Sequence, residues 1–123
     1  MVFYKDPMST SQLKLNLVEG SVTFQCSVDT AQTIKKELAQ LIVSLKSASS
    51  AVGGGQRPER QEPLEYQHAG DVFLELFCNP NIWPSPFAAK VLVTLRDDRI
   101  RLTTEAELTQ VIEDINQYIE SNS

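Results

Sequence analysis

The chain is poor in the residues that most often carry out chemistry. It has two cysteines, one histidine and one tryptophan among its 123 residues. Two cysteines are too few for a disulfide framework, and no Cys/His cluster has the spacing of a zinc site. No acidic stretch has the spacing of a calcium loop, and the pair Asp97-Asp98 suits a hairpin turn better than a metal site. We therefore expect neither a metal nor a cofactor.

Long apolar runs are also missing. No stretch approaches the length of a membrane span, and the N-terminus lacks the basic start and apolar core of a signal peptide. The glycine run Gly53-Gly54-Gly55 follows no strand and precedes no Gly-Lys-Ser/Thr sequence, so it is not a phosphate-binding loop. A cytoplasmic, non-enzymatic protein is the resulting expectation, because an enzyme would have to assemble its site from scattered residues.

The few cysteines and the histidine fall at unremarkable positions. Cys26 and Cys78 lie on apolar faces of expected strands, and we expect both to be buried free thiols. His68 lies in a polar stretch, and no third group is indicated that would orient a Cys–His pair for catalysis. We expect an ordinary surface histidine.

A strand hairpin followed by an amphipathic helix is present near each end of the chain. Alternation of apolar residues through 13–26 and 91–104 is typical of half-buried strands. Turns are expected at Glu19-Gly20 and at Asp97-Asp98, although Asp-Asp is a weak turn signal that leaves a longer loop open. The expected pairs are Leu17 with Val22, Leu15 with Phe24, Leu13 with Cys26, Leu95 with Ile100, and Val93 with Leu102.

Each hairpin is followed by the signals of a helix. Asp29 with Gln32, and Thr104 with Glu107, have the spacing of a capping box. Behind each cap, apolar residues recur at helical spacing and form one stripe that needs a sheet to cover. The stripes are Ala31, Ile34, Leu38, Leu41, Ile42 and Leu45 in the first helix, and Leu108, Val111, Ile112, Ile115 and Ile119 in the second.

These elements predict a single α+β domain over residues 1–123 with a mainly antiparallel sheet. Both helices are expected on one face of the sheet, although a parallel arrangement of the two hairpins in a barrel or two-sheet form stays open. The Gly/Ser/Pro-rich stretch 47–63 is expected to be a mobile loop. The expected strands are 13–18, 21–27, 71–78, 90–96 and 99–103, and the expected helices are 29–47 and 105–120.

The strand at 71–78 has two different faces. Val72, Leu74, Leu76 and Cys78 alternate on one face, and Phe73, Glu75 and Phe77 lie on the other. If both helices cover the first face, the two phenylalanines lie on the open side of the sheet. They are then either covered by the N-terminal segment around Phe3 and Tyr4 or displayed.

The segment 79–87 is the most individual stretch of the chain. Its three prolines exclude regular structure, and it holds the only tryptophan, Trp83, beside Ile82 and Phe87. Such a loop either packs on the core as a lid or presents Ile82, Trp83 and Phe87 to a protein partner, because tryptophan is enriched in binding hot spots.

A second binding pattern lies in the expected second hairpin. Arg96, Arg99 and Arg101, together with Phe73 and Phe77, are suited to bind single-stranded nucleic acid by phosphate contact and base stacking. The net charge of −5 argues against this interpretation, because a dedicated nucleic-acid-binding protein is expected to be basic.

The order hairpin, helix, strand, hairpin, helix resembles that of small cyanobacterial proteins of unknown function. The phrases Asp71-Val-Phe-Leu-Glu-Leu76 and Leu102-Thr-Thr-Glu-Ala-Glu-Leu108 carry the resemblance, which covers about residues 13 to 120 as a pattern. Some of those proteins look like the PC4/Whirly single-strand-binding fold. The resemblance implies a candidate fold and no functional residue.

The leading hypothesis is a non-enzymatic protein-interaction or assembly-accessory protein. It depends on the loop around Trp83 and on the C-terminal helix, which carries five acids from Thr104 onward and neither Lys nor Arg. The runner-up is single-stranded nucleic-acid binding through the open face of the sheet. A homodimer is left open, and no membrane span is expected.

Overall fold

The computed structural model describes residues 11–53 and 60–122, and within these ranges the chain forms six strands and two helices. The class is α+β, as predicted. In chain order the elements are β1 (Ser11–Asn16), β2 (Ser21–Cys26), α1 (Val28–Gly53), β3 (Leu64–Ala69), β4 (Phe73–Cys78), β5 (Lys90–Arg96), β6 (Arg101–Glu107) and α2 (Leu108–Asn122).

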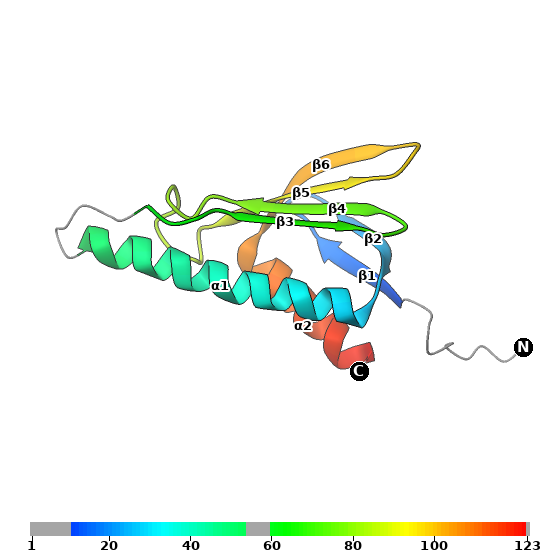
Figure 1. Cartoon of the computed structure of the whole chain (residues 1–123), viewed down its shortest axis with the longest axis horizontal. Helices are drawn as coiled ribbons and strands as arrows, with labels where there is room; N and C mark the ends of the chain where they lie inside the picture. The colour runs from blue at the N-terminus through cyan, green and yellow to red at the C-terminus, as the bar shows by residue number, and fades with distance from the viewer. Residues whose placement is uncertain (1–10, 54–59, 123) are drawn as a thin grey trace, which may run out of the picture.

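The strands form two antiparallel sheets. β1 and β2 make a two-stranded sheet, and β3, β4, β5 and β6 make a four-stranded sheet in that order. Both helices and the β1–β2 hairpin lie on the same side of the four-stranded sheet (Figure 1). The predicted placement of both helices on one face is therefore confirmed, and the described strands divide between two sheets.

One apolar core joins all of these elements. Strand residues of both sheets contribute to it, and so do the predicted stripes of the two helices, of which Ile42 and Ile112 are only partly buried. Cys26 and Cys78 are free and buried in this core, as expected. The period-2 and period-3.6 patterns thus identified the buried faces correctly.

The register of both hairpins differs from the expected pairing by two residues. In the first hairpin Leu15 pairs with Val22, and in the second Leu95 pairs with Leu102. Each turn closes with the same bond: Leu17 N donates to Gly20 O at 2.9 Å, and Asp97 N donates to Ile100 O at 3.0 Å. A shift of two preserves which face of the hairpin each side chain occupies.

Gly20 explains the first of these turns. Its φ of 90° lies in the left-handed region that glycine adopts without strain. The turn therefore spans Leu17 to Gly20, and regular pairing of the strands starts one step further from the turn, at Asn16 with Ser21.

The first helix has a different cap and a later end than expected. Ser27, instead of Asp29, caps it: its Oγ accepts the Thr30 amide at 3.1 Å, and its carbonyl accepts the Ala31 amide at 3.0 Å. The helix continues to Gly53, so the first part of the loop expected at 47–63 is helical. Buried Ala48 extends the apolar stripe into this part and holds it on the core. Residues 54–59 lie outside the described residues.

β3 is a strand that the sequence interpretation missed. It pairs along its whole length with β4, from Leu64 opposite Cys78 to Ala69 opposite Phe73. It is an edge strand in which only Leu64 is fully buried, so its own alternation is weak. His68 belongs to this strand and is half-buried, in place of the surface residue that we expected.

The C-terminal helix begins three residues later than predicted. Thr104 and Glu107, read as a capping box, belong to β6, which stays paired with β5 up to Lys90 opposite Glu107. Ala106 is fully buried in this pairing. Burial and strand pairing therefore outweigh the local helix signal, and the Leu108 amide then bonds to Ala89 O at 3.0 Å.

Candidate functional site

The outer face of the four-stranded sheet points away from both helices. Figure 1 shows no helix on this side within the part of the chain that the structure describes. The register aligns the side chains of β4, β5 and β6 in three rows across this face. The rows are Phe77–Leu92–Glu105, Glu75–Thr94–Thr103 and Phe73–Arg96–Arg101.

The row nearest the β5–β6 turn is basic. The Arg96 guanidinium lies 4.2 Å from the centre of the Phe73 ring, a cation–π distance. Arg101 is the cross-strand neighbour of Arg96. The structure therefore brings Phe73, Phe77, Arg96 and Arg101 onto one face, as the nucleic-acid hypothesis requires. Arg99 lies apart from this row, in the exposed turn.

Acidic residues share this face and limit its positive field. Glu65 lies opposite Phe77, Glu105 lies opposite Leu92, and Glu107 lies opposite Lys90. All three glutamates therefore point to the outer face. Glu75 lies at the centre, where its Oε2 accepts a bond from Gln67 Nε2 at 2.7 Å. The face thus has a basic end and an acidic end, with Phe77 and Leu92 on the acidic side.

The β5–β6 turn is fixed by an aspartate. The Asp97 carboxylate accepts the amides of Arg99 at 2.8 Å and Ile100 at 2.9 Å. These amide bonds, from Ile100 and then Arg99, lower the pKa of the Asp97 carboxyl. This role is structural, and it matches the expectation that Asp97-Asp98 forms a turn.

The β4–β5 loop has a packed residue and two displayed ones. Trp83 is half-buried against the core, with its side chain near the Cys78 thiol. Ile82 is 66% exposed and Phe87 is 85% exposed. The three residues predicted to act together are therefore separated. Trp83 packs on the core, as a lid would, whereas the side chains of Ile82 and Phe87 are exposed to solvent.

Asn81 holds this loop in place. Its Oδ1 accepts the Gln61 amide at 2.8 Å, and its Nδ2 donates to the Gln61 carbonyl at 2.8 Å and to Asn79 Oδ1 at 2.8 Å. The loop is thereby tied to the segment that enters β3. Ile82, next to Asn81, is displayed from an anchored backbone, which reduces the entropy lost when a partner binds.

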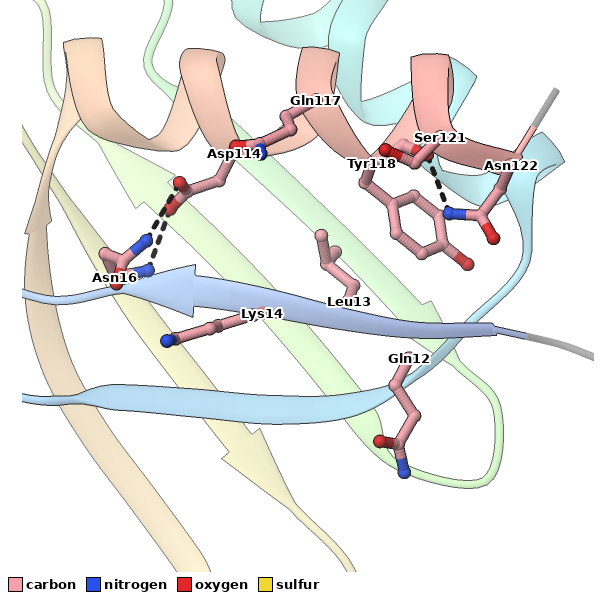
Figure 2. A pocket seen from close by; sticks show the side chains of 9 residues that line it. All are labelled: Gln12, Leu13, Lys14, Asn16, Asp114, Gln117, Tyr118, Ser121 and Asn122. Atoms are coloured by element: carbon pink, nitrogen blue, oxygen red, sulfur yellow. Dashed lines mark hydrogen bonds between the residues drawn. The ribbon is translucent and has the colours of Figure 1, made fainter.

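A polar pocket of about 250 Å³ lies between β1 and α2. Figure 2 shows Asp114 and Tyr118 projecting from α2 toward β1. Asp114 is 6% exposed, and it accepts bonds from Asn16 N at 2.8 Å, Asn16 Nδ2 at 3.0 Å and Gln110 Nε2 at 2.9 Å. The Tyr118 hydroxyl donates to the Cys26 carbonyl. These bonds join α2 to both strands of the first hairpin.

Sequence reasoning missed this pocket, because Asp114 was counted only among the acids of a solvated helix. The available signal was its position: it lies three residues after Val111 and four before Tyr118, on the buried side of the helix. A buried acid at such a position requires hydrogen-bond donors. Since its acceptor capacity is used by Asn16 and Gln110, we regard Asp114 as a structural residue.

An apolar groove of about 280 Å³ separates β2 from the end of the β5–β6 hairpin. Val22 lies on one side, and Leu95, Ile100 and Leu102 lie on the other. Ile100 is 68% exposed although it occupies the same face as buried Leu95. The sequence placed Leu95, Ile100 and Leu102 on the apolar face of the hairpin, and of these three only Leu95 is buried.

The two thiols are poorly reactive by position. Burial raises the pKa of Cys26 to about 11 and that of Cys78 to about 11, and for Cys78 the nearby Trp83 side chain opposes part of the rise. Over residues 11–53 and 60–122, no three His, Cys, Asp or Glu side chains gather as a metal site. None of the described helices is both long and apolar enough to span a membrane.

Comparison with known proteins found no matching family model, no matching curated protein and no matching solved structure. The resemblance to the PC4/Whirly fold accordingly stays a prediction, and the functional argument depends on the surfaces themselves.

Proposed function

We propose that this chain is a non-enzymatic, cytoplasmic interaction protein that binds a protein partner with the outer face of its four-stranded sheet and the adjoining β4–β5 loop. The observation that carries the proposal is the composition of that face. It combines Phe73, Phe77 and Leu92, which is 40% exposed, with charges of both signs. The two cysteines are free, which suits a reducing compartment.

A protein partner suits this surface better than a lipid or a small ligand. Small ligands bind in concave pockets, whereas this surface is the side of a sheet on which Figure 1 shows no helix among the described residues. Phe73 on the basic side and Phe77 and Leu92 on the acidic side combine apolar area with charges of both signs, a mixture that protein interfaces share. Phe87 and Ile82 add exposed apolar side chains on an anchored loop.

Single-stranded nucleic acid is the second candidate. The packing of Arg96 on Phe73 supports it, because stacked arginine and phenylalanine side chains also stack with bases. Glu75 and Glu105 oppose it, since a phosphate backbone crossing this face would meet both carboxylates.

The two candidates differ in what co-purifies with the chain. Tagged protein is recovered from native lysate with and without nuclease, alongside a Leu92→Glu variant. We expect nuclease-resistant protein partners that Leu92→Glu loses, because a charge placed beside Phe77 within an apolar contact must be desolvated. Gln40→Glu on α1 is the matched control, since Gln40 is also exposed but lies on a helix that covers the other face of the sheet.

A direct binding measurement tests the second candidate. Anisotropy of a labelled single-stranded oligonucleotide at low salt is compared for wild type and a variant with Arg96, Arg99 and Arg101 replaced by Ala. Binding that is lost in the variant and falls with salt supports nucleic acid as the ligand. Absence of wild-type binding at low salt rejects that candidate.

A further inference from the structure

The two helices leave an apolar groove between them on the side of the molecule opposite the outer sheet face. Its volume is about 290 Å³. α1 and α2 pack against each other beneath the four-stranded sheet (Figure 1). The groove is lined by Lys35, Leu38, Ala39, Ile42, Ile112, Ile115 and Asn116.

The apolar surface of this groove continues along the outside of α1. Lys35, Ala39, Ile42, Val43 and Lys46 follow at helical spacing and form one stripe. Val43 is 56% exposed, and Ala39 is exposed beside it. If this stripe faced only solvent, it would normally consist of polar residues. The helical side is therefore a candidate contact surface.

The walls of the groove carry opposite charges. α1 contributes Lys35 and Lys46 in the stripe, whereas Glu37, two positions from Lys35, projects from the far side of the helix. Along the outside of α2, Glu113 and Glu120 flank Asn116, and this helix has neither Lys nor Arg. One wall is thus basic and the other acidic.

We propose that two copies of this chain associate through these helical faces, with a two-fold axis along the groove. Such an axis places α1 of one copy over α2 of the other, so that each basic wall meets an acidic wall twice in one dimer. Val43 and Ala39 of one copy then contact the apolar wall formed by Ile112 of the other. This inference is independent of the proposed partner on the sheet.

The size of the surface sets the expected strength. α2 has 15 residues and is about 22 Å long. Two packed helices are about 20 Å wide, so the shared face is on the order of 400–450 Å² per copy, about half of a standard interface. We expect a weak dimer with a dissociation constant on the order of 10–100 μM at low salt.

The experiment uses two charge-reversed chains. One carries Lys35→Glu and Lys46→Glu, and the other carries Glu113→Lys and Glu120→Lys. Each alone has two walls of the same sign and is expected to dimerise at least about tenfold more weakly than wild type. Mixed in equal amounts, they regain complementary walls and should form a heterodimer. Sedimentation velocity from roughly 1 to roughly 500 μM measures all four samples.

Controls separate association from folding and from the sheet surface. Far-ultraviolet circular dichroism and a melt are recorded for every variant, and the recovery in the mixture cannot come from a misfolded chain. Val43→Glu should weaken the dimer, and Leu92→Glu on the sheet should not. A variant that loses the lysate partner but still dimerises is affected at the sheet surface. A variant that keeps the partner but no longer dimerises is affected at the helical surface.

Three results overturn the inference. Wild type that stays monomeric at low salt over the whole range removes it. A dimer that neither charge-reversed chain weakens lies on another surface. Chains that weaken alone but do not recover when mixed exclude the pairing of α1 with α2 of a second copy.

Discussion

Replacing Asp114 by Ala should be among the most destabilising changes at a polar position of this chain. Asp114 is the buried acid that joins α2 to the end of β1 (Figure 2). Its two oxygens accept three hydrogen bonds, two from Asn16 and one from Gln110. Alanine removes the acceptor from all three donors at once, in a part of the molecule that sets the position of the first hairpin against α2.

The magnitude follows from what each donor loses. The Asn16 amide points away from β2, so without Asp114 it is left without an acceptor, at a cost of about 1–3 kcal/mol. The side-chain amides of Asn16 and Gln110 can turn toward water, and each loses about 1 kcal/mol. Removing a buried carboxylate also removes its desolvation cost, which offsets part of the loss. We expect a net destabilisation of about 3 kcal/mol.

Urea unfolding followed by circular dichroism measures this change, and a melt should show a fall of about 10 °C. Glu113→Ala is the matched control, because Glu113 precedes Asp114 and is exposed; its effect should stay within about 0.5 kcal/mol. Asn16→Ala and the double variant complete a cycle, and the coupling between Asn16 and Asp114 should be about 1 kcal/mol.

The reasoning is refuted if Asp114→Ala costs less than about 1 kcal/mol, or no more than Glu113→Ala. It is also refuted if the cycle shows no coupling, since the stability of the site would then not come from the bond between these two side chains. Dilute protein is used throughout, so that self-association through α2 contributes nothing.

Two further predictions concern the loop and the thiols. Trp83→Ala should destabilise the fold by about 2–3 kcal/mol, which is less than the loss of a fully buried tryptophan would cost. Phe87→Ser should leave stability within about 0.5 kcal/mol and weaken partner capture. Melts and pull-downs of both variants test this, and an unchanged melting temperature for Trp83→Ala would contradict the interpretation of Trp83 as a lid. Because burial raises the pKa of Cys26 and Cys78 to about 11, stability should fall as pH rises from about 9 through 11, and native protein should react with a thiol reagent far more slowly than unfolded protein. Equal rates in the two states would show that the thiols are accessible.

The faces of the elements could be predicted from the sequence, but their exact pairing could not. Alternation decides which side of a strand is buried, and Leu13, Leu15 and Leu95 are all buried as predicted. It does not distinguish registers that differ by two, because both bury the same side. The turns made that choice, through the left-handed Gly20 and through the Asp97 carboxylate.

Errors in element type occurred where long-range pairing opposed a local signal. Thr104 to Glu107 looks like a helix start, yet the partners of these residues are on β5. β3 has a weak pattern of its own and is held by β4. The α1 stripe continues to Ala48 inside a segment whose serines and glycines resemble a loop. A single sequence read by local windows has no access to these contacts.

The candidate site was predictable in the same partial way. Phe73 and Phe77 share the outer face with Arg96 and Arg101, because side chains alternate between the two faces along each strand and paired residues point to the same face. The union of Asn16 with Asp114 joins residues 98 positions apart, and no local spacing reveals it. The separation of Trp83 from Ile82 and Phe87 depends on how Asn81 anchors the loop, which is likewise a tertiary contact.

The two surfaces have a joint consequence because they lie on opposite sides of the molecule. Val43 is exposed on the helical side and Ile112 lines the groove there, whereas Leu92 and Phe77 lie on the outer sheet face. A dimer through the helices would leave both sheet faces outward, so it would present two equal binding sites. Such a dimer binds a partner that carries repeated sites more tightly than a monomer does, without any new contact. The weak dimer expected from the interface area would then let concentration regulate this avidity, and Val43→Glu, which keeps the sheet face intact, would remove it.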